Sequence, residues 1–383
     1  MKHLFLFEEA SGNAASFGVG TYIKNLIAAL KTENVKITVC KTIGKNKELY
    51  TEYDGNIRYV YVPSPANLYA DKRDYYTNVF FLIYPYIDKH EKTVFHFNYL
   101  NCLQIAKLLR RHTSAKILIT IHYRQLSASE HIDVEKEFIN DYCDKVIVLG
   151  NHAYFSLIKD FSVNPDKIVI VPNGIQDCFE LPTNNNPLII RDIFKISPDE
   201  KVISFVGRFD LNKNAALLVK AFLNLLEKHH SIRLVLAGSG DFSQVLKLVR
   251  HSWGKITFTG FLNIENLHNL YRITDIGVVP SIYEEFGYVA AEMMMHQIPI
   301  IANNTSGLAE IIEDGISGKL IDLSPNQKEE DEVKNLSDAI EELLDNNNLC
   351  SYLGINARKR FLEKYQISIF KNKIKSLYNS LFI

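Results

Sequence analysis

Cysteine and tryptophan are scarce in this sequence. Its 383 residues include five cysteines and one tryptophan. No two cysteines form a Cys-x-x-Cys pair, so we expect free thiols in a reducing compartment and no zinc site built from cysteines. The five are Cys40, Cys102, Cys143, Cys178 and Cys350.

Long hydrophobic runs are also absent. No stretch approaches the ~20 apolar residues that a membrane-spanning helix needs. The first apolar run, which starts at His3, stops at Glu8 and Glu9. A signal peptide needs a longer apolar segment, so we interpret this run as a first strand. The sequence therefore predicts a cytoplasmic protein.

Neither sign of charge is in excess. Forty-three Lys and Arg stand against 44 Asp and Glu, which gives a formal net charge of −1. Proteins held to nucleic acid by their overall charge need a basic surface, so we expect no nucleic-acid partner. The chain is 47% hydrophobic, which excludes global disorder. Its length of 383 residues is sufficient for two domains.

Short apolar runs alternate with amphipathic segments through the first 175 residues. Seven runs rich in Val, Ile, Phe and Tyr predict strands buried on both faces of a mostly parallel sheet. They begin at His3, Val35, Arg58, Thr93, Lys116, Lys145 and Lys167. Between the first two, apolar residues from Val19 to Leu30 recur at helical spacing. This alternation predicts βαβ units and a doubly wound sheet.

The pattern breaks at residues 176–200, where three consecutive Asn and three Pro predict a linker with a short helical piece. Six more strand candidates follow, beginning at Lys201, Arg233, Lys255, Asp275, Ile298 and Gly318. We predict an α/β protein with two facing Rossmann-like domains, residues 1–180 and 181–365. Ligands bind beyond the carboxyl ends of such strands, so we expect an interdomain cleft.

The most informative stretch runs from Val278 to Asp322. A strand leads into a loop with Glu284, and Gly287 then opens a helix that contains Glu292. Backbone N–H groups at a helix start can approach a phosphate closely, and the helix dipole favours it. Carboxylates accept hydrogen bonds from hydroxyls. Taken alone, two Glu at this spacing are more often surface acids, but around a phosphate-binding helix start they predict a nucleotide-sugar site.

The surrounding motifs extend this pattern. PSIYEEFGYVAAE, from Pro280, resembles the PSxxExFGxxxxE signature of retaining glycosyltransferases of family four, which have the GT-B fold. VGRFDLNKN, AGSGD, TSGLAE and EDGISG resemble further family elements in the second half. SFGVGTYIKNL, TIHYR and VPNGI resemble the glycine loop, the strand-end His motif and the hinge-proximal PNG. The resemblance spans nearly the whole chain, and implies that a C-terminal crossover helix over 366–383 packs on the N-terminal domain.

The resemblance implies catalytic roles for four residues. Arg208 and Lys213 would grip the donor diphosphate, where two cations suit a leaving group that gains negative charge. Glu284 would contact the donor sugar, and His122 would contact the transferred sugar. Taken singly, each of these residues is more often a solvated charge or a structural histidine.

The resemblance also implies donor-binding roles for six residues. Glu292 would hold the ribose hydroxyls, and Phe286 and Gly287 would supply backbone amides, beside Tyr288. Gly18 and Gly20 in the N-terminal loop would let backbone from the other domain reach the diphosphate.

Several positions depart from the family pattern. Asn214 and Ser306 stand where the family usually has glycine, and Gln176 stands where it usually has Asp. Asn98 replaces a frequent second His, and Tyr123 replaces a common Asp. None removes a charge from the implied diphosphate clamp, but together they leave the identity of the donor sugar open.

The implied reaction needs neither cofactor nor metal, since the nucleotide-sugar is a co-substrate, with a UDP-sugar favoured. The family's transfer is usually drawn as same-face attack in which the leaving phosphate helps deprotonate the acceptor hydroxyl. No two Asp are separated by one residue, so the metal-binding DxD of the other large glycosyltransferase fold is absent. We expect a metal-independent transferase.

The acceptor is not identified by any motif, and a glycan, a lipid-linked, a peptide or a small-molecule acceptor stays open. The aromatic-rich stretch from Pro63 to Lys92 fits a lid, an acceptor groove, a membrane-touching helix or, most often, an ordinary buried helix. In the last case four residues would pack a core: Phe80, Phe81, Ile83 and Tyr84.

A small basic face offers a further partner. Lys107, Arg110 and Arg111 leave peripheral contact with the inner membrane face open, although a solvated helix face is the commoner interpretation.

Three other functions compete. A dinucleotide oxidoreductase needs GxGxxG, but Ile23 stands where the third glycine should be. A GT-B epimerase and a catalytically silent glycosyltransferase-like binding subunit both remain alternatives.

Overall fold

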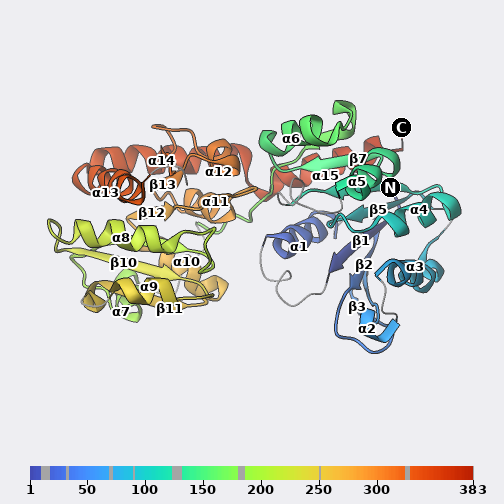
Figure 1. Cartoon of the computed structure of the whole chain (residues 1–383), viewed down its shortest axis with the longest axis horizontal. Helices are drawn as coiled ribbons and strands as arrows, with labels where there is room; N and C mark the ends of the chain where they lie inside the picture. The colour runs from blue at the N-terminus through green and yellow to red at the C-terminus, as the bar shows by residue number, and fades with distance from the viewer. Residues whose placement is uncertain are drawn as a thin grey trace. The chain divides into compact units, whose positions relative to one another are not determined.

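The chain folds into two compact units, Met1–Gly174 with Ile367–Ile383, and Ile175–Gln366. Figure 1 shows the computed structural model. It describes residues 1–9, 18–31, 34–68, 72–88, 91–122, 132–179, 186–249, 252–323 and 328–382.

Unit 1 is built on an eight-stranded sheet. In spatial order its strands are β3 (Tyr50–Asp54), β4 (Ile57–Tyr61), β2 (Lys36–Thr42), β1 (His3–Glu9), β5 (Thr93–Phe97), β6 (Lys116–Thr120), β7 (Lys145–Val148) and β8 (Ile168–Ile170). Every neighbouring pair is parallel except β3 and β4, which are antiparallel. All seven predicted strands are present. The edge strand β3 was missed.

Helices cover both faces of this sheet. They are α1 (Val19–Leu30), α2 (Pro65–Leu68), α3 (Lys72–Ile83), α4 (Leu103–His112), α5 (Ile132–Glu137), α6 (Asn151–Phe161) and α15 (Ile367–Ser380). Alternation along β1 sends Leu4 and Leu6 into a core with α1 and α15. Phe5 and Phe7 point to the other face, into a core with α3 and α4.

The aromatic-rich stretch forms a helix that packs into the core. Tyr75, Tyr76, Val79 and Phe80 of α3 are buried in unit 1. The expectation for Phe81 was wrong, because its side chain is 57% exposed on the opposite side of the helix. Residues 69–71 and 89–90 of this stretch lie outside the described residues.

The basic face on α4 is largely paired with acids. Arg110 donates to Asp144 Oδ2 at 2.6 Å, and Lys107 pairs with Glu137 at 2.6 Å. Among the described residues, no helix is long and apolar enough to cross a membrane.

Unit 2 holds a six-stranded, wholly parallel sheet. Its spatial order is β11 (Ile256–Gly260), β10 (Ile232–Ala237), β9 (Lys201–Val206), β12 (Ile276–Val279), β13 (Ile300–Asn303) and β14 (Lys319–Ile321). All six strands were predicted. The chain moves outward from β9 to β10 and β11, then returns to the other side of β9 with β12. The order therefore reverses between β9 and β12, where ligands of open α/β sheets bind.

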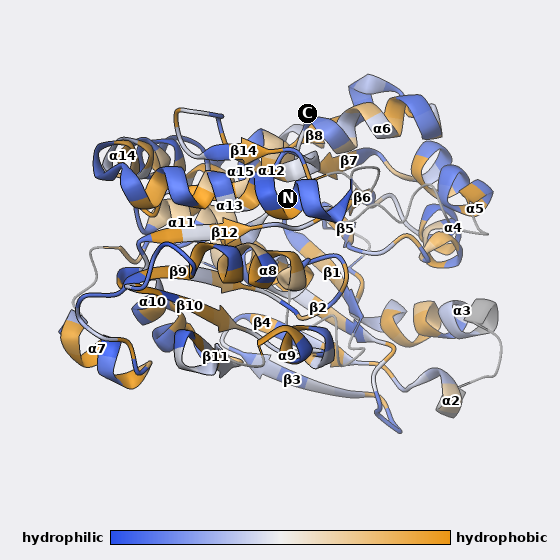
Figure 2. Ribbon diagram, turned by 60° about the vertical axis from the view of Figure 1, so that its left-hand side comes forward, coloured by the Kyte–Doolittle hydropathy of each residue, from blue (hydrophilic) through white to orange (hydrophobic). Residues whose placement is uncertain are grey.

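Helices cover both faces of the second sheet as well. They are α7 (Pro187–Ile193), α8 (Ala215–Leu225), α9 (Ser243–Val249), α10 (Ile264–Arg272), α11 (Tyr288–Met295), α12 (Ser306–Ile311), α13 (Glu329–Asp345) and α14 (Asn347–Lys364). Figure 2 shows hydrophobic and hydrophilic residues alternating along α7 and α8. In α7 Ile190 is buried, whereas Leu188, Ile189 and Ile193 are exposed. Ile203 and Phe205 of β9 pack with α8 and α13, whereas Val202 faces α7 and α10.

The predicted linker contains α7, the short helical piece expected within 176–200. Its residues 180–185 lie outside the described part of the chain. The two predicted Rossmann-like sheets are thus confirmed as two α/β units, with a mostly parallel sheet in unit 1 and a wholly parallel sheet in unit 2, each between helices.

Candidate functional site

Arg208, Lys213 and Glu284 lie in the loops that follow the carboxyl ends of β9 and β12. Arg208 follows β9 by two residues, and Ser281 follows β12 by two. The two strands are direct neighbours in the sheet. The loops after them therefore start side by side at the point where the strand order reverses.

A glycine turn fixes the loop that carries Arg208. A Cβ atom on Gly238 would lie 1.7 Å from Gly207 O, and one on Gly240 would lie 2.5 Å from Phe209 O. The Phe209 N–H also donates to Ser239 O at 2.8 Å. Only glycine permits this close approach of two backbones. The turn thus holds the chain on both sides of Arg208.

Arg208 itself extends into solvent. Its guanidinium lies 3.1 Å from Asp210 Oδ2, and its side chain is 53% exposed. Such exposed ion pairs contribute about 0–1 kcal/mol. Arg208 can therefore leave Asp210 for a stronger anionic partner at little cost.

Lys213 and Glu284 form the central ion pair of the site. The Lys213 Nζ donates to Glu284 Oε1, and the two side chains are 16% and 15% exposed. Ser281 donates to the same oxygen at 2.9 Å. The family resemblance implies a diphosphate role for Lys213 and a sugar role for Glu284, and the structure brings the two side chains together.

Asn212 ties the two loops to each other and was missed by the sequence analysis. Its Nδ2 donates to Tyr283 O at 3.0 Å, and the Tyr283 N–H donates back to Asn212 Oδ1 at 3.1 Å. The Ile282 N–H donates to Asn212 O at 2.8 Å. Asn212 was missed because nothing in the sequence between Arg208 and Lys213 distinguishes a structural Asn from a solvated loop residue.

A contact with the start of α12 holds Glu284 from the other side. The Gly307 N–H donates to Glu284 O at 2.8 Å, and the Glu284 N–H donates to Ser306 Oγ at 3.0 Å. A Cβ on Gly307 would lie 2.5 Å from Glu285 O, so only glycine fits. Ser306, at a family glycine position, has a φ of 38°, and its hydroxyl accepts a hydrogen bond that glycine could not.

A similar backbone requirement explains Asn214. Its φ of 54° and ψ of 35° are left-handed, at the start of α8. Glycine adopts this conformation freely, and Asn is among the few other residues that tolerate it. Asn214 therefore adopts a backbone conformation that glycine would also adopt.

The start of α11 presents backbone rather than side chains. Gly287 has a φ of 88°, which favours glycine, and precedes the first helical residue, Tyr288. The Phe286 side chain is buried, with its ring 5.1 Å from that of Tyr288 and 5.8 Å from that of Tyr365. Any ligand contact at Phe286 and Gly287 must therefore come from their backbone. First-turn N–H groups of a helix have no partner within it and can meet an anion.

Glu292 lies farther along α11 and has a different partner. Tyr271 donates to its Oε2 at 2.8 Å. Burial raises the pKa of the Glu292 carboxyl to about 7, with the Tyr271 hydrogen bond acting in the opposite direction. A carboxylate here gains from donors that replace its lost water, and sugar hydroxyls are such donors.

His122 belongs to unit 1, just after β6. The Asn98 amide donates to Phe7 O at 3.1 Å, so its Oδ1 faces His122 Nε2 at 3.0 Å. Burial lowers the pKa of His122 to about 3, and the nearby His96 lowers it as well, by a smaller amount. The neutral ring therefore donates from Nε2 and keeps Nδ1 as an acceptor. Asn98, noted as a departure, orients the predicted histidine.

Gly18 and Gly20 lie at the start of α1 in unit 1. Gly18 has a φ of 50°, which favours glycine, and its carbonyl accepts from the Tyr22 N–H at 2.9 Å. Gly20 is buried within the first turn. The loop before them, residues 10–17, and Tyr123 after His122 lie outside the described residues.

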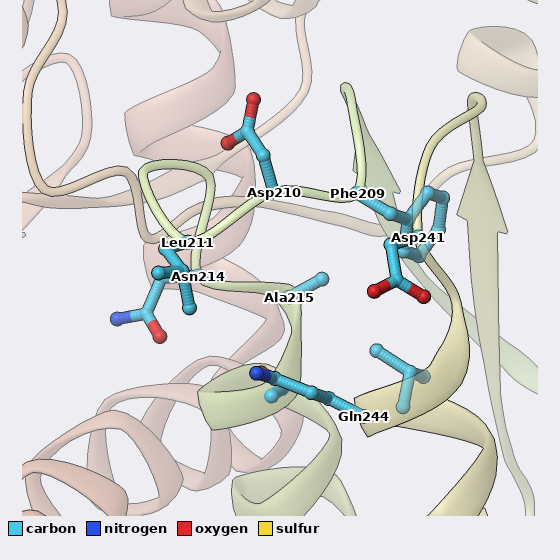
Figure 3. Close-up of a pocket in the computed structure, with 9 residues that line it drawn as sticks. Phe209, Asp210, Leu211, Asn214, Ala215, Asp241 and Gln244 are labelled. Atoms are coloured by element: carbon cyan, nitrogen blue, oxygen red, sulfur yellow. The ribbon is translucent and has the colours of Figure 1, made fainter.

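A shallow hollow of about 270 Å³ lies near this site, between the starts of α8 and α9. Figure 3 shows the Asp210 and Asp241 carboxylates among its lining residues. Its lining contains neither Arg208 nor Lys213, and two acids do not favour a diphosphate.

Comparison with known proteins identifies the family of the chain. Residues 188–360 match the family model of glycosyl transferases group 1, and residues 18–177 match that of glycosyltransferase family 4. An uncharacterised glycosyltransferase from Methanocaldococcus jannaschii is 31% identical over 237 residues, which is 60% of this chain and 58% of that protein. For two further curated relatives the matched region is 46% and 65% of their length. The chain thus spans about half to two-thirds of these relatives.

Solved structures share the fold over the full length. Sucrose-phosphate synthase from Thermosynechococcus elongatus superposes with a TM-score of 0.82 at 22% identity, covering 100% of this chain and 99% of that one. Anabaena HepE in complex with UDP gives a TM-score of 0.76 at 16% identity, covering 99% and 100%. With both halves matched by family models and the fold matched throughout, the chain belongs to glycosyltransferase family four, the glycosyl transferases group 1, and has the GT-B fold.

Proposed function

We propose that this protein transfers a sugar from a nucleotide-diphosphate-sugar to an acceptor hydroxyl, with retention of the anomeric configuration. One observation carries the proposal. The Lys213–Glu284 pair and Arg208 lie on neighbouring loops at the strand-order reversal of unit 2. A site that offers cations beside a carboxylate suits a ligand with both a diphosphate and hydroxyl groups.

The two cations would stabilise the leaving group. Negative charge grows on the diphosphate as the bond between sugar and phosphate breaks, and fixed cations favour that state over the intact donor. Lys213 is held by Glu284 and enclosed by both loops, so it needs little reorganisation. Arg208 is exposed and can close onto the outer phosphate oxygens.

The remaining residues would position the donor. Glu284 would accept from a sugar hydroxyl while it orients Lys213, and Glu292 would accept from the ribose. Phe286, Gly287 and Tyr288 would offer backbone N–H groups at the start of α11. In unit 1, His122 stays a prediction for the transferred sugar, and Gly18 and Gly20 for the diphosphate.

The proposed transfer uses no metal and no enzymic base. Arg208, Lys213 and the helix start supply the positive potential that a divalent ion would otherwise provide. The departing phosphate would take the acceptor proton on the same face. A UDP-sugar is the favoured donor, since HepE, which shares the fold, has been solved with UDP and with UDP-glucose. The acceptor is proposed only as a hydroxyl of a glycan or glycoconjugate.

A donor screen tests this function. Purified protein is incubated with UDP-, GDP- and ADP-sugars, with and without EDTA, and mass spectrometry scores nucleotide release and sugar products. We expect release of nucleotide from one donor class, unaffected by EDTA and lost in Glu284→Ala. Glu265→Ala removes an exposed acid of the same unit and should keep full activity.

Other results would contradict the proposal. A changed sugar on an intact nucleotide would indicate an epimerase, and donor binding without turnover a silent binding subunit. Loss of activity with EDTA that added Mg²⁺ or Mn²⁺ restores would contradict metal independence, and an inverted product anomer would contradict retention.

A further inference from the structure

Three metal-binding side chains from distant parts of unit 2 meet in one cluster. Cys178 lies in the segment before α7, His268 on α10, and His296 directly after α11. One potential ligand atom from each lies within 4.8 Å of the others. We propose that Cys178, His268 and His296 bind a zinc ion, independently of the donor site.

The distances suit a single ion. His268 Nδ1 lies 2.9 Å from His296 Nε2 and 3.4 Å from Cys178 Sγ. Zinc bonds to nitrogen are about 2.0–2.1 Å and to sulfur about 2.3 Å. Ligand atoms of one tetrahedral ion are therefore separated by roughly 3.3–3.6 Å. The His268–His296 and His268–Cys178 separations need to open by only a few tenths of an ångström, and Cys178 and His296 lie within 4.8 Å of each other.

The ligand set selects the type of metal. One thiolate and two imidazoles suit zinc and exclude Mg²⁺ and Ca²⁺, which prefer oxygen. Met295 Sδ lies 3.8 Å from Cys178 Sγ and adds a further soft group. Three protein ligands leave a fourth zinc position for water.

The segment that carries Cys178 is anchored rather than loose. Asp177 accepts from both terminal nitrogens of Arg358, at 2.9 and 2.7 Å. The Arg358 guanidinium also lies 4.8 Å from the ring centroid of Phe179. This clamp on both neighbours of Cys178 fixes the direction of its thiol, as a metal site requires.

A zinc ion here would join α10 to α11. His296 follows Glu292 by four residues, and Tyr271, which donates to Glu292, follows His268 by three. The ion would thus brace the two helices that hold Glu292. It would lie outside the reacting groups, so metal-independent transfer and a zinc site are compatible.

Metal content and competition titrations test the inference. The full chain is stripped with EDTA, and zinc binding is measured against a chromophoric chelator without any sugar donor. We expect one zinc per chain, and at least about a hundredfold weaker binding in Cys178→Ser and in His268→Gln, since even outer-shell changes cost about 10–100-fold. Cobalt in place of zinc should give a thiolate-to-cobalt charge-transfer band that Cys178→Ser abolishes.

Two variants are matched controls. His229→Gln disrupts the other potential ligand group, His229, Glu341 and Asp345, whose Glu341 is already bonded to Lys228. Cys350→Ser removes a second half-buried thiol. Both should bind zinc like the wild type. The proposal would be overturned if the wild type bound no zinc, or if Cys178→Ser and His268→Gln bound zinc as tightly as the wild type. Neither result bears on glycosyl transfer.

Discussion

Adding one methyl group at Gly307 should disturb the loop that carries Glu284. The new Cβ of Gly307→Ala would lie 2.5 Å from Glu285 O and 2.8 Å from Glu284 O. Real Cβ contacts are essentially never shorter than 3.0 Å, and both atoms in its way are backbone. Either α12 or the Glu284 loop must therefore move by about half an ångström or more.

The size of the effect follows from this overlap. Overpacking by one methyl group typically costs about 1–3 kcal/mol of stability. A displacement near 1 Å in a catalytic group can cost about a hundredfold in rate. We therefore expect Gly307→Ala to lose about 1–3 kcal/mol in the free energy of unfolding and about 10–100-fold in kcat/KM for the donor.

Gly254→Ala is the matched control. Gly254 lies in the same unit, and a Cβ there would meet no atom within 4 Å. Its stability should stay within about 0.5 kcal/mol of wild type. Urea denaturation gives the free energy of unfolding of both variants, and steady-state kinetics give their kcat/KM for the donor. If Gly307→Ala matches Gly254→Ala in both measurements, the inferred packing of Gly307 against the Glu284 loop is wrong.

Two further predictions concern single residues in each unit. Asn212→Ala removes both side-chain bonds to Tyr283 and should lower stability by about 1–3 kcal/mol and raise the donor KM, measured by denaturation and steady-state kinetics; an unchanged KM would contradict the loop-tying role. Acid should destabilise unit 1 through His96, which bonds Thr120 at 2.7 Å and Tyr378 at 2.5 Å. Burial lowers the pKa of His96 to about 3. Between pH 6.5 and 3, His96 therefore binds a proton in the unfolded chain but not in the folded chain. As the pH falls through this range, the free energy of unfolding decreases by up to about 1.4 kcal/mol per pH unit. Denaturation from pH 7 to pH 5 should show a shallower fall for His96→Gln than for wild type, and equal slopes would refute it.

Most strands could be predicted because they are buried on both faces, and a strand buried on both faces appears in the sequence as a run of consecutive apolar residues. Strand β3 was missed because its residues Tyr50–Asp54 are mostly exposed, and nothing in YTEYD distinguishes a solvent-facing edge strand from a loop. The exposure of Phe81 was missed because an aromatic-rich composition does not indicate which side of the helix faces the core.

The charged residues and glycines of the candidate site could be proposed from the sequence, because the motifs that resemble the family contain them in a fixed order. The residues that orient them were not. Asn212 acts through contacts to Tyr283, 71 positions away. Cys178, His268 and His296 are likewise separated by 90 and 28 positions, so no local pattern marks them. Such groupings exist only after the strands and helices have packed.

The kinetic effect of Lys213 is the most direct test of the diphosphate site. The rate of nucleotide release at saturating donor is measured for wild type, Lys213→Met and Lys220→Met. Lys220 lies on α8 of the same unit and pairs with Glu329, which makes it a matched lysine control. Stabilisation of the leaving diphosphate predicts a kcat about 10²–10³-fold lower for Lys213→Met, and an unchanged kcat for Lys220→Met. Equal kcat values for Lys213→Met and wild type would contradict the assignment of this site to the donor diphosphate.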